Sequence, residues 1–248
     1  MFVQTRTLQL ALSAAATMLL PLCAAAEPVV PDFSAADFST AKPNRYFPLT
    51  TGHSTVMIGT GTEGGTAISE LAVFTVLGVG PQIMGVQTVI AIDEAFAGPL
   101  LMERTFDYFA ADAAGNVWYL GEDVENFQYD AAGVLTGSDT HSAWRAGVGD
   151  ALPGIAMSAA LTPATPLFSE HAPAEAAMDY ATLVETGLTL TTSAGQFTDV
   201  IKFEERSMAE PDLREFKFYA PDIGLIRAEE GLNPAMTDPE LVTELLHL

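Results

Sequence analysis

Apolar and polar residues alternate in short stretches along most of this chain, which is the pattern of half-buried β-strands. Turn residues separate the stretches, and little helical periodicity lies between them. Such spacing is typical of an antiparallel sheet whose neighbouring strands are joined by turns. The predicted strands are 46–49 with 56–58, 67–76, 86–92, the segment 103–127, 188–191 with 197–205, and 213–219 with 223–227.

Three segments depart from this pattern. Residues 173–178 begin with a proline and predict a short helix, and the tail from Pro239 onward predicts a second, amphipathic one. Residues 130–166 are rich in Gly, Ala and Pro and predict a long structured loop. We therefore expect a mainly β protein: a single antiparallel curved sheet or half-barrel with one or two short helices and a long loop.

Residues 103–127 predict one long β-hairpin. Asp112-Ala113-Ala114-Gly115 suits a type I turn followed by glycine in the left-handed conformation. This turn pairs Asp112 with Asn116, and the register continues to Phe106 opposite Glu122. A slip of one residue would exchange the two faces of the hairpin.

Both faces of this hairpin mix aromatic and charged side chains. On one face Arg104 would lie diagonally across from Glu122, close enough to pair, and on the other Glu103 would face Glu125. The first face holds Arg104, Phe106, Tyr108, Trp118, Leu120, Glu122 and Val124, and the second holds Phe109, Val117, Tyr119, Asp107, Asp123, Glu103 and Glu125. The first face predicts the wall of a ligand site.

The first 26 residues have the features of a signal peptide. Arg6 supplies the positive start, residues 8–20 form an apolar run too short to span a bilayer comfortably, and small residues precede Glu27. We expect cleavage before Glu27, an extended arm over residues 27–45 and one β-rich domain over residues 46–248. The predicted location is periplasmic or extracellular.

Cys23 offers an alternative, because a cysteine near the end of such a segment can be lipidated. The residue before it is Leu22, whereas lipidation favours a small residue there, so a soluble protein is the leading interpretation. Cys23 is also the one cysteine of the chain. Cleavage after residue 26 would leave no disulfide, thiol nucleophile or cysteine metal site.

Acidic residues outnumber basic ones by 32 to 10, which gives a net charge of −22. Such a chain repels nucleic acid and anionic membranes. It suits cationic partners, divalent metal or a salty exterior. No stretch after the signal segment is long and apolar enough for a membrane-spanning helix, and the oligomeric state stays open.

Three pieces of the chain resemble a group of uncharacterised secreted bacterial proteins and lipoproteins. They are Tyr46-Phe47-Pro48-Leu49, the stretch Gly115-Asn116-Val117-Trp118-Tyr119 with Gly121-Glu122, and residues 218–226. The resemblance implies an antiparallel half-barrel similar to the lipoprotein-carrier fold, and it brings no catalytic residues. The chain departs from it at Asp222, where glycine is expected, and at His53, where an aromatic residue is expected.

Candidate acid–base residues are Glu122, Asp107, His141 and His171. A carboxylate on an apolar strand face would have a raised pKa, and histidine titrates near neutral pH. The sequence has no HExxH zinc spacing, no GxSxG elbow and no phosphate-binding loop. We predict no cofactor and no dedicated metal site, with calcium possible at the acidic end of the hairpin (Glu103, Asp107, Asp123, Glu125).

The leading hypothesis is a secreted binding protein for a small apolar or aromatic ligand. Phe106, Tyr108, Trp118 and Leu120 would hold its body, and Arg104 and Glu122 would fix its polar end. The alternatives are a secreted hydrolase or lyase with a carboxylate–histidine pair, and a calcium-stabilised structural protein. Whether the protein is an enzyme stays open at this point.

Overall fold

The computed structural model describes residues 26–63, 65–162, 165–233 and 235–247. The predicted signal peptide, with Cys23, lies outside the described residues except for residue 26. No helix among the described residues is long and apolar enough to cross a membrane.

One 15-stranded sheet makes up the protein, with two short 3-10 turns, η1 (Ala35–Phe38) and η2 (Pro173–Glu175). The strands are β1 (Ser54–Glu63), β2 (Thr66–Ile83), β3 (Val86–Ala97), β4 (Leu100–Ala111), β5 (Val117–Tyr129), β6 (Leu135–Asp139), β7 (Trp144–Arg145), β8 (Leu152–Met157), β9 (Leu167–Phe168), β10 (Glu170–His171), β11 (Asp179–Thr192), β12 (Gly195–Ser207), β13 (Glu215–Ala220), β14 (Gly224–Glu230) and β15 (Leu241–His247).

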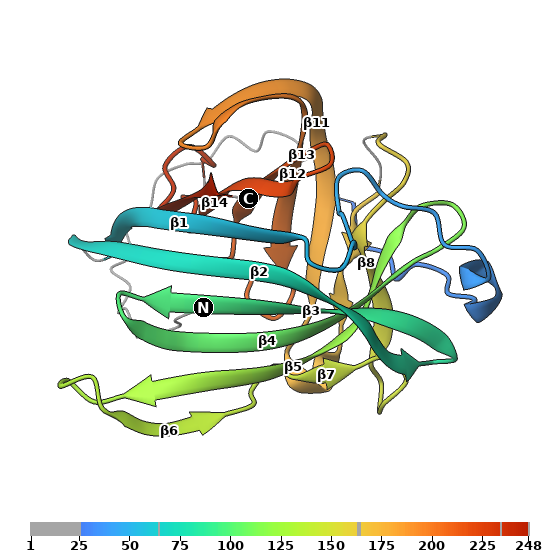
Figure 1. Ribbon diagram of the computed structural model, residues 1–248, viewed down its shortest axis with the longest axis horizontal. Helices are drawn as coiled ribbons and strands as arrows, with labels where there is room; N and C mark the ends of the chain where they lie inside the picture. The colour runs from blue at the N-terminus through green and yellow to red at the C-terminus, as the bar shows by residue number, and fades with distance from the viewer. Residues whose placement is uncertain (1–25, 64, 163–164, 234, 248) are drawn as a thin grey trace, which may run out of the picture.

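The sheet curves into a nearly closed antiparallel barrel, as Figure 1 shows with β1–β5 in front and β11–β14 crossing behind them. The strand order is β10-β8-β5-β4-β3-β2-β1-β15-β14-β13-β12-β11-β9. Its two ends, β9 and β10, are separated in the chain only by Ser169, whose backbone N–H donates to the Asp179 carbonyl of β11. The path of the sheet therefore returns to its start, and the predicted mainly β, single-sheet fold is confirmed.

The two predicted helices are not α-helices. Residues 173–178 form only the turn η2, and the tail forms β15, which pairs with β1 and β14. Leu241, Thr243 and Leu245 are buried at every second position of β15, which is strand periodicity. Ladder hydrogen bonds on both sides outweigh the helix propensity of the tail.

The predicted loop 130–166 contains three strands. β6, β7 and β8 each pair with β5, so the chain returns to the same strand three times. These strands escape detection because β7 has only two residues, while β6 and β8 contain Gly or Pro and show no clear alternation of apolar and polar residues.

Side chains on one face of the sheet meet inside the barrel. Lys217 of β13 lowers the pKa of Asp93 of β3, although four strands lie between β13 and β3 in the sheet. An interaction across that separation runs through the interior, so Lys217 and Asp93 mark the inward face. Direct cross-strand partners share a face, so the pairing assigns inward residues on the neighbouring strands.

The arm before Tyr46 packs against the outer face of the β4–β5 hairpin. Phe33 and Phe38 lie edge-on to Trp118, with ring centroids 5.4 and 5.9 Å away. Val29 forms a parallel bridge with Leu167 of β9. The arm therefore covers a tryptophan that would otherwise be exposed on the barrel wall.

Candidate functional site

The turn of the β4–β5 hairpin is as predicted. The Asp112 N–H donates to the Asn116 carbonyl, and Gly115 has a φ of +95°. The Asp112 carboxylate accepts hydrogen bonds from the backbone N–H groups of Ala114, Gly115 and Asn116, and from the indole of Trp118. Burial by itself raises the Asp112 pKa, but these hydrogen bonds outweigh it and lower the pKa below its ordinary value.

Beyond the turn, a β-bulge changes the predicted register. Ala110 does face Trp118, but Asp107 faces Glu122 and Phe106 faces Asp123. Gly121 permits the bulge, because its φ is +132° and a Cβ there would lie 2.4 Å from the Trp144 carbonyl oxygen. The prediction that Phe106 faces Glu122 is therefore wrong, and Glu122 moves to the inward face.

The bulge brings Asp107, Tyr119 and Glu122 together. The Tyr119 hydroxyl lies 2.5 Å from Asp107 Oδ1 and 2.8 Å from Glu122 Oε2. A phenol has one proton to donate, so the second contact is a hydrogen bond only when that carboxyl group carries a proton of its own. We call these three residues the carboxyl–tyrosine triad.

Burial sets the acid–base properties of the triad. Asp107 is 7% exposed and Glu122 is 9% exposed. Desolvation raises the pKa of Glu122 to about 7, against the hydrogen bond from Tyr119. Desolvation, followed by the charge of Asp93, raises the pKa of Asp107 well above its ordinary value.

Further carboxylates extend the triad around the barrel interior. Desolvation is the largest cause of the raised pKa of Asp93, to about 6, and of Glu215, to about 7. Repulsion from neighbouring carboxylates adds to desolvation at both of these residues. The interior carboxylates are Asp93, Glu103, Asp107, Glu122, Glu170, Asp179, Glu205, Glu215 and Glu230.

Lys217 places a cation in this interior. Its Nζ donates to Glu205 Oε2 at 2.5 Å and lies 3.7 Å from Glu215 Oε2. Burial alone would lower the Lys217 pKa, but Glu205 and Glu215 more than offset it and raise the pKa. Its side chain is 28% exposed, so water reaches this part of the interior, whereas the triad lies deeper.

Trp144 adds an unmatched donor beside the triad. It pairs with Glu122 in the sheet, and its ring lies 5.4 Å from that of Tyr119. The side chain is 4% exposed, and its indole N–H has no hydrogen-bond acceptor among the described residues. The indole lies near Glu122 and acts to lower that carboxyl pKa against the effect of burial, but the two groups do not meet in a hydrogen bond of ordinary geometry.

A row of aromatic rings leads away from the triad. Tyr119 stacks on Phe109 at 4.8 Å, Phe109 contacts Phe47 at 4.9 Å, and Phe47 contacts Phe74 at 6.3 Å. The interior thus combines an apolar aromatic wall with carboxylates at one end of it. This arrangement can hold a molecule that has an apolar body and a polar or cationic end.

The other predicted ligand residues lie away from this interior. Arg104 pairs with Glu94 at 2.7 Å rather than with Glu122, Tyr108 donates to Asp123, and Trp118 donates to Asp112. Glu103 faces Asn126, not Glu125 as predicted. Leu120 is fully buried and Phe106 is partly buried against the core, so of the predicted set Glu122 joins the triad.

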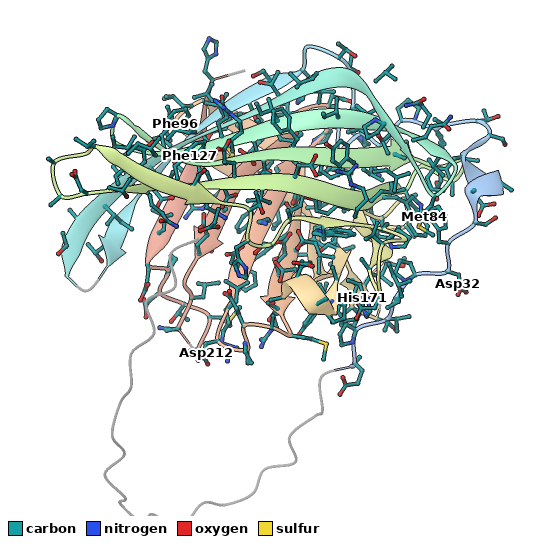
Figure 2. All side chains as sticks on the ribbon, turned by 90° about the horizontal axis from the view of Figure 1, so that it is seen from below. Asp32, Met84, Phe96, Phe127, His171 and Asp212 are labelled. Atoms are coloured by element: carbon teal, nitrogen blue, oxygen red, sulfur yellow. The ribbon has the colours of Figure 1, made fainter. Side chains whose placement is uncertain are left out.

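The two candidate histidines do not contact the triad within the described residues. His141 is exposed in the turn after β6. His171 lies in β10, with its ring 4.9 Å from Phe168 and its Nδ1 buried without a partner, and Figure 2 places it beside η2. A histidine partner for Glu122 or Asp107 stays a prediction without a supporting contact.

The acidic residues that suggested calcium separate onto two faces. Glu103 and Asp107 point inward, whereas Asp123 binds Arg145 at 2.5 Å and Glu125 accepts from Ser138. Among the described residues, no group of three His, Cys, Asp or Glu side chains has the geometry to hold a metal ion. Two surface hollows of about 320 and 310 Å³ lie around Arg45 and share no residue with the interior carboxylates.

No family model and no curated protein matches the chain. Two solved structures are similar over most of their length. One, from Bacteroides fragilis, is provisionally described as an exported protein with a YmcC-like fold; it is 14% identical, with a TM-score of 0.43, over 82% of this chain and 97% of that one.

The second solved structure, from Parabacteroides distasonis, is provisionally described as a lipoprotein. It is 15% identical, with a TM-score of 0.42, and the match covers 83% of this chain and 99% of that one. Both descriptions name the class of exported proteins and lipoproteins that the sequence resembles. The TM-scores are too low to establish a shared fold, so the barrel rests on its own strand topology.

Several residues of the interior were not predicted from the sequence. Glu215, Lys217 and Tyr219 alternate with Phe216 and Phe218, and such a row ordinarily predicts phenylalanines inside and charges outside. The structure has the opposite arrangement, with Phe216 and Phe218 beneath Lys202 at 3.4 and 5.1 Å from its Nζ.

Proposed function

We propose that this protein is an exported binding protein that holds a small molecule inside its barrel. The ligand would lie against the inward face of β4 and β5, with its polar end at the carboxyl–tyrosine triad. Its apolar part would follow the aromatic row that leads from Tyr119 to Phe74. The proposal keeps the ligand class expected from the sequence and moves the site to the opposite face of the hairpin.

The observation that carries this proposal is the unmatched indole N–H of Trp144 beside the triad. A buried donor without an acceptor costs about 1–3 kcal/mol, and binding sites are where such a cost is recovered by a ligand. The approach of two buried carboxyl groups to the single Tyr119 hydroxyl points the same way, because a structural core has no need of a second carboxyl group there.

Tryptophan fluorescence tests the proposal, because the chain has two tryptophans in different settings. A Trp118→Phe variant leaves Trp144 as the reporter inside the barrel, and a Trp144→Phe variant leaves Trp118 beneath the arm. Screening lipids and aromatic small molecules should change the emission of the first variant only. Ligands that change only the second variant would contradict an interior site.

Export is tested separately. Expression of the full chain with its native start should give a periplasmic or secreted protein whose first residue is Glu27. A full-length chain that stays in the cytoplasm would contradict the signal-peptide prediction, and a lipid on Cys23 would favour the lipoprotein alternative.

A second candidate function is acid–base catalysis by the triad, as a hydrolase or lyase. The pKa of Glu122, about 7, suits a group that gives and takes a proton near neutral pH. Asp107 would be its partner through the Tyr119 hydroxyl, and no histidine is needed. Ester, glycoside and phosphoester substrates can be screened with wild type, Glu122→Gln and His171→Ala in parallel. The two variants separate acid–base catalysis by Glu122 from catalysis by His171.

A further inference from the structure

Asp107, Glu122 and Glu170 share a part of the interior in which no described basic side chain forms an ion pair with them. The ion pairs of the described residues involve other acids, such as Glu94, Asp123, Asp199 and Glu205. Burial, and after it repulsion from Glu122, raises the pKa of Glu170 well above its ordinary value. Buried carboxylates gathered in this way need protons or a cation from outside.

We infer that the ligand of the barrel interior is an organic ammonium ion with an aromatic body and an oxygen close to its charge. This inference rests on the proposed binding function and names its ligand class. The ammonium group would lie between Glu122 and Glu170, and the aromatic body would lie along Tyr119 and Phe109. The oxygen would accept the hydrogen bond that Trp144 now lacks.

Lys217 shows how this interior receives an ammonium group. It sits between Glu205 and Glu215, donates to the first and lies within ion-pair distance of the second. A ligand ammonium between Glu122 and Glu170 would repeat that arrangement deeper in the barrel. Its charge would also face the rings of Tyr119 and Trp144, and a cation near an aromatic face is stabilised further.

Trp144 gives the observation that is independent of the acids. Its indole is buried, lies beside Tyr119 and has no acceptor among the described atoms, although Glu122 is its partner in the sheet. An ammonium group cannot satisfy an N–H donor, so the ligand needs an oxygen as well as a charge. A metal ion fits less well, because no three described acidic side chains converge with metal-site geometry.

Three small molecules test each part of this inference by calorimetry at pH 8. Phenylethanolamine has the ammonium, the hydroxyl and the ring; phenethylamine lacks the hydroxyl; phenylethylene glycol replaces the ammonium by a neutral hydroxyl. We expect phenylethanolamine to bind, the glycol to bind at least tenfold more weakly, and phenethylamine to lie between them.

Variants locate the site. Glu122→Gln and Glu170→Gln should each weaken phenylethanolamine binding at least tenfold, whereas Glu185→Gln, an exposed position on β11, should stay within twofold of wild type. The advantage of phenylethanolamine over phenethylamine should vanish in Trp144→Phe. Binding at pH 7 should release protons, seen as a dependence of the binding heat on the buffer, because carboxyl groups that ionise for the ammonium give up their protons.

Failure of this inference differs from failure of the proposed function. Equal binding of the glycol and the amine, or no binding of either amine at millimolar concentration, would overturn the ammonium class. The fluorescence screen of the Trp118→Phe variant would still decide whether another molecule enters the barrel. Binding of calcium in place of the amines, lost in Glu122→Gln, would also overturn it and favour a metal-binding role.

Discussion

Replacing Glu122 by glutamine should stabilise the barrel at pH 8 and leave it nearly unchanged at pH 4.5. In the unfolded chain this carboxyl group ionises at its ordinary pKa of 4.5, but in the barrel burial raises the pKa to about 7. Below pH 4 both states hold the proton. As the pH rises from 4.5 to 7 the unfolded chain releases its proton first, so the folded state loses stability.

The magnitude follows from this difference in pKa. One pKa unit corresponds to about 1.4 kcal/mol. The rise of the Glu122 pKa from 4.5 to about 7 therefore lowers the free energy of unfolding by about 3 kcal/mol at pH 8. At pH 4.5 the same group lowers it by less than about 0.5 kcal/mol. Glutamine carries no ionisable proton and keeps a donor and an acceptor for Tyr119, so the variant should recover this loss.

Urea unfolding at pH 4.5 and pH 8, monitored by far-ultraviolet circular dichroism, measures the change in the free energy of unfolding. We expect the free energy of unfolding of Glu122→Gln to exceed that of wild type by about 3 kcal/mol at pH 8. Such a gain raises the Tm by on the order of 10 °C in a chain of this size. Glu185→Gln removes the same charge from an exposed position and controls for the relief of the overall negative charge. A difference between variant and wild type that is the same at both pH values would show that Glu122 ionises normally, and the reasoning about the interior would be wrong.

Three other substitutions test separate parts of the structure by urea unfolding. Gly121→Ala should cost about 3 kcal/mol, because its positive φ strains any other residue and a Cβ would meet the Trp144 carbonyl; an unchanged stability would refute the bulge. Asp112→Ala should cost about 2–3 kcal/mol at pH 7 and less as the pH falls through the lowered pKa of Asp112, since protonation already removes much of the gain in wild type. Lys217→Met should lower the free energy of unfolding by about 3 kcal/mol at pH 8. The loss should be smaller at pH 5, because Glu215, with a pKa of about 7, is then neutralised by a proton. An equal loss at both pH values would argue against compensation of the carboxylate charge by Lys217.

Local chemistry made the hairpin turn predictable. Asp112 and Gly115 determine the conformation of five consecutive residues through hydrogen bonds that the sequence order alone brings together. The register beyond the turn was not predictable, because the bulge at Gly121 accommodates a close approach by Trp144, which comes from a later strand. One shift in register then moved Glu122 to the opposite face.

The interior carboxylates were beyond sequence analysis for a different reason. Alternation indicates which residues share a face within each strand, but the inward face is defined only when all the strands meet around the barrel. Asp93 of β3 and Lys217 of β13 are far apart in the chain and interact across the interior. The tail also depended on distant partners, since β15 is a strand because β1 and β14 lie on either side of it.

The position of β15 between β1 and β14 has a consequence for how the barrel folds. The strands from β1 to β5 and those from β11 to β14 can each form by local hairpins, but the two groups are joined across this seam by β15. Until Leu241–His247 has docked, β1 and β14 both present open edges, which are prone to pair with other chains. A folding intermediate that lacks docked β15 is therefore the species of this protein most exposed to edge-to-edge aggregation.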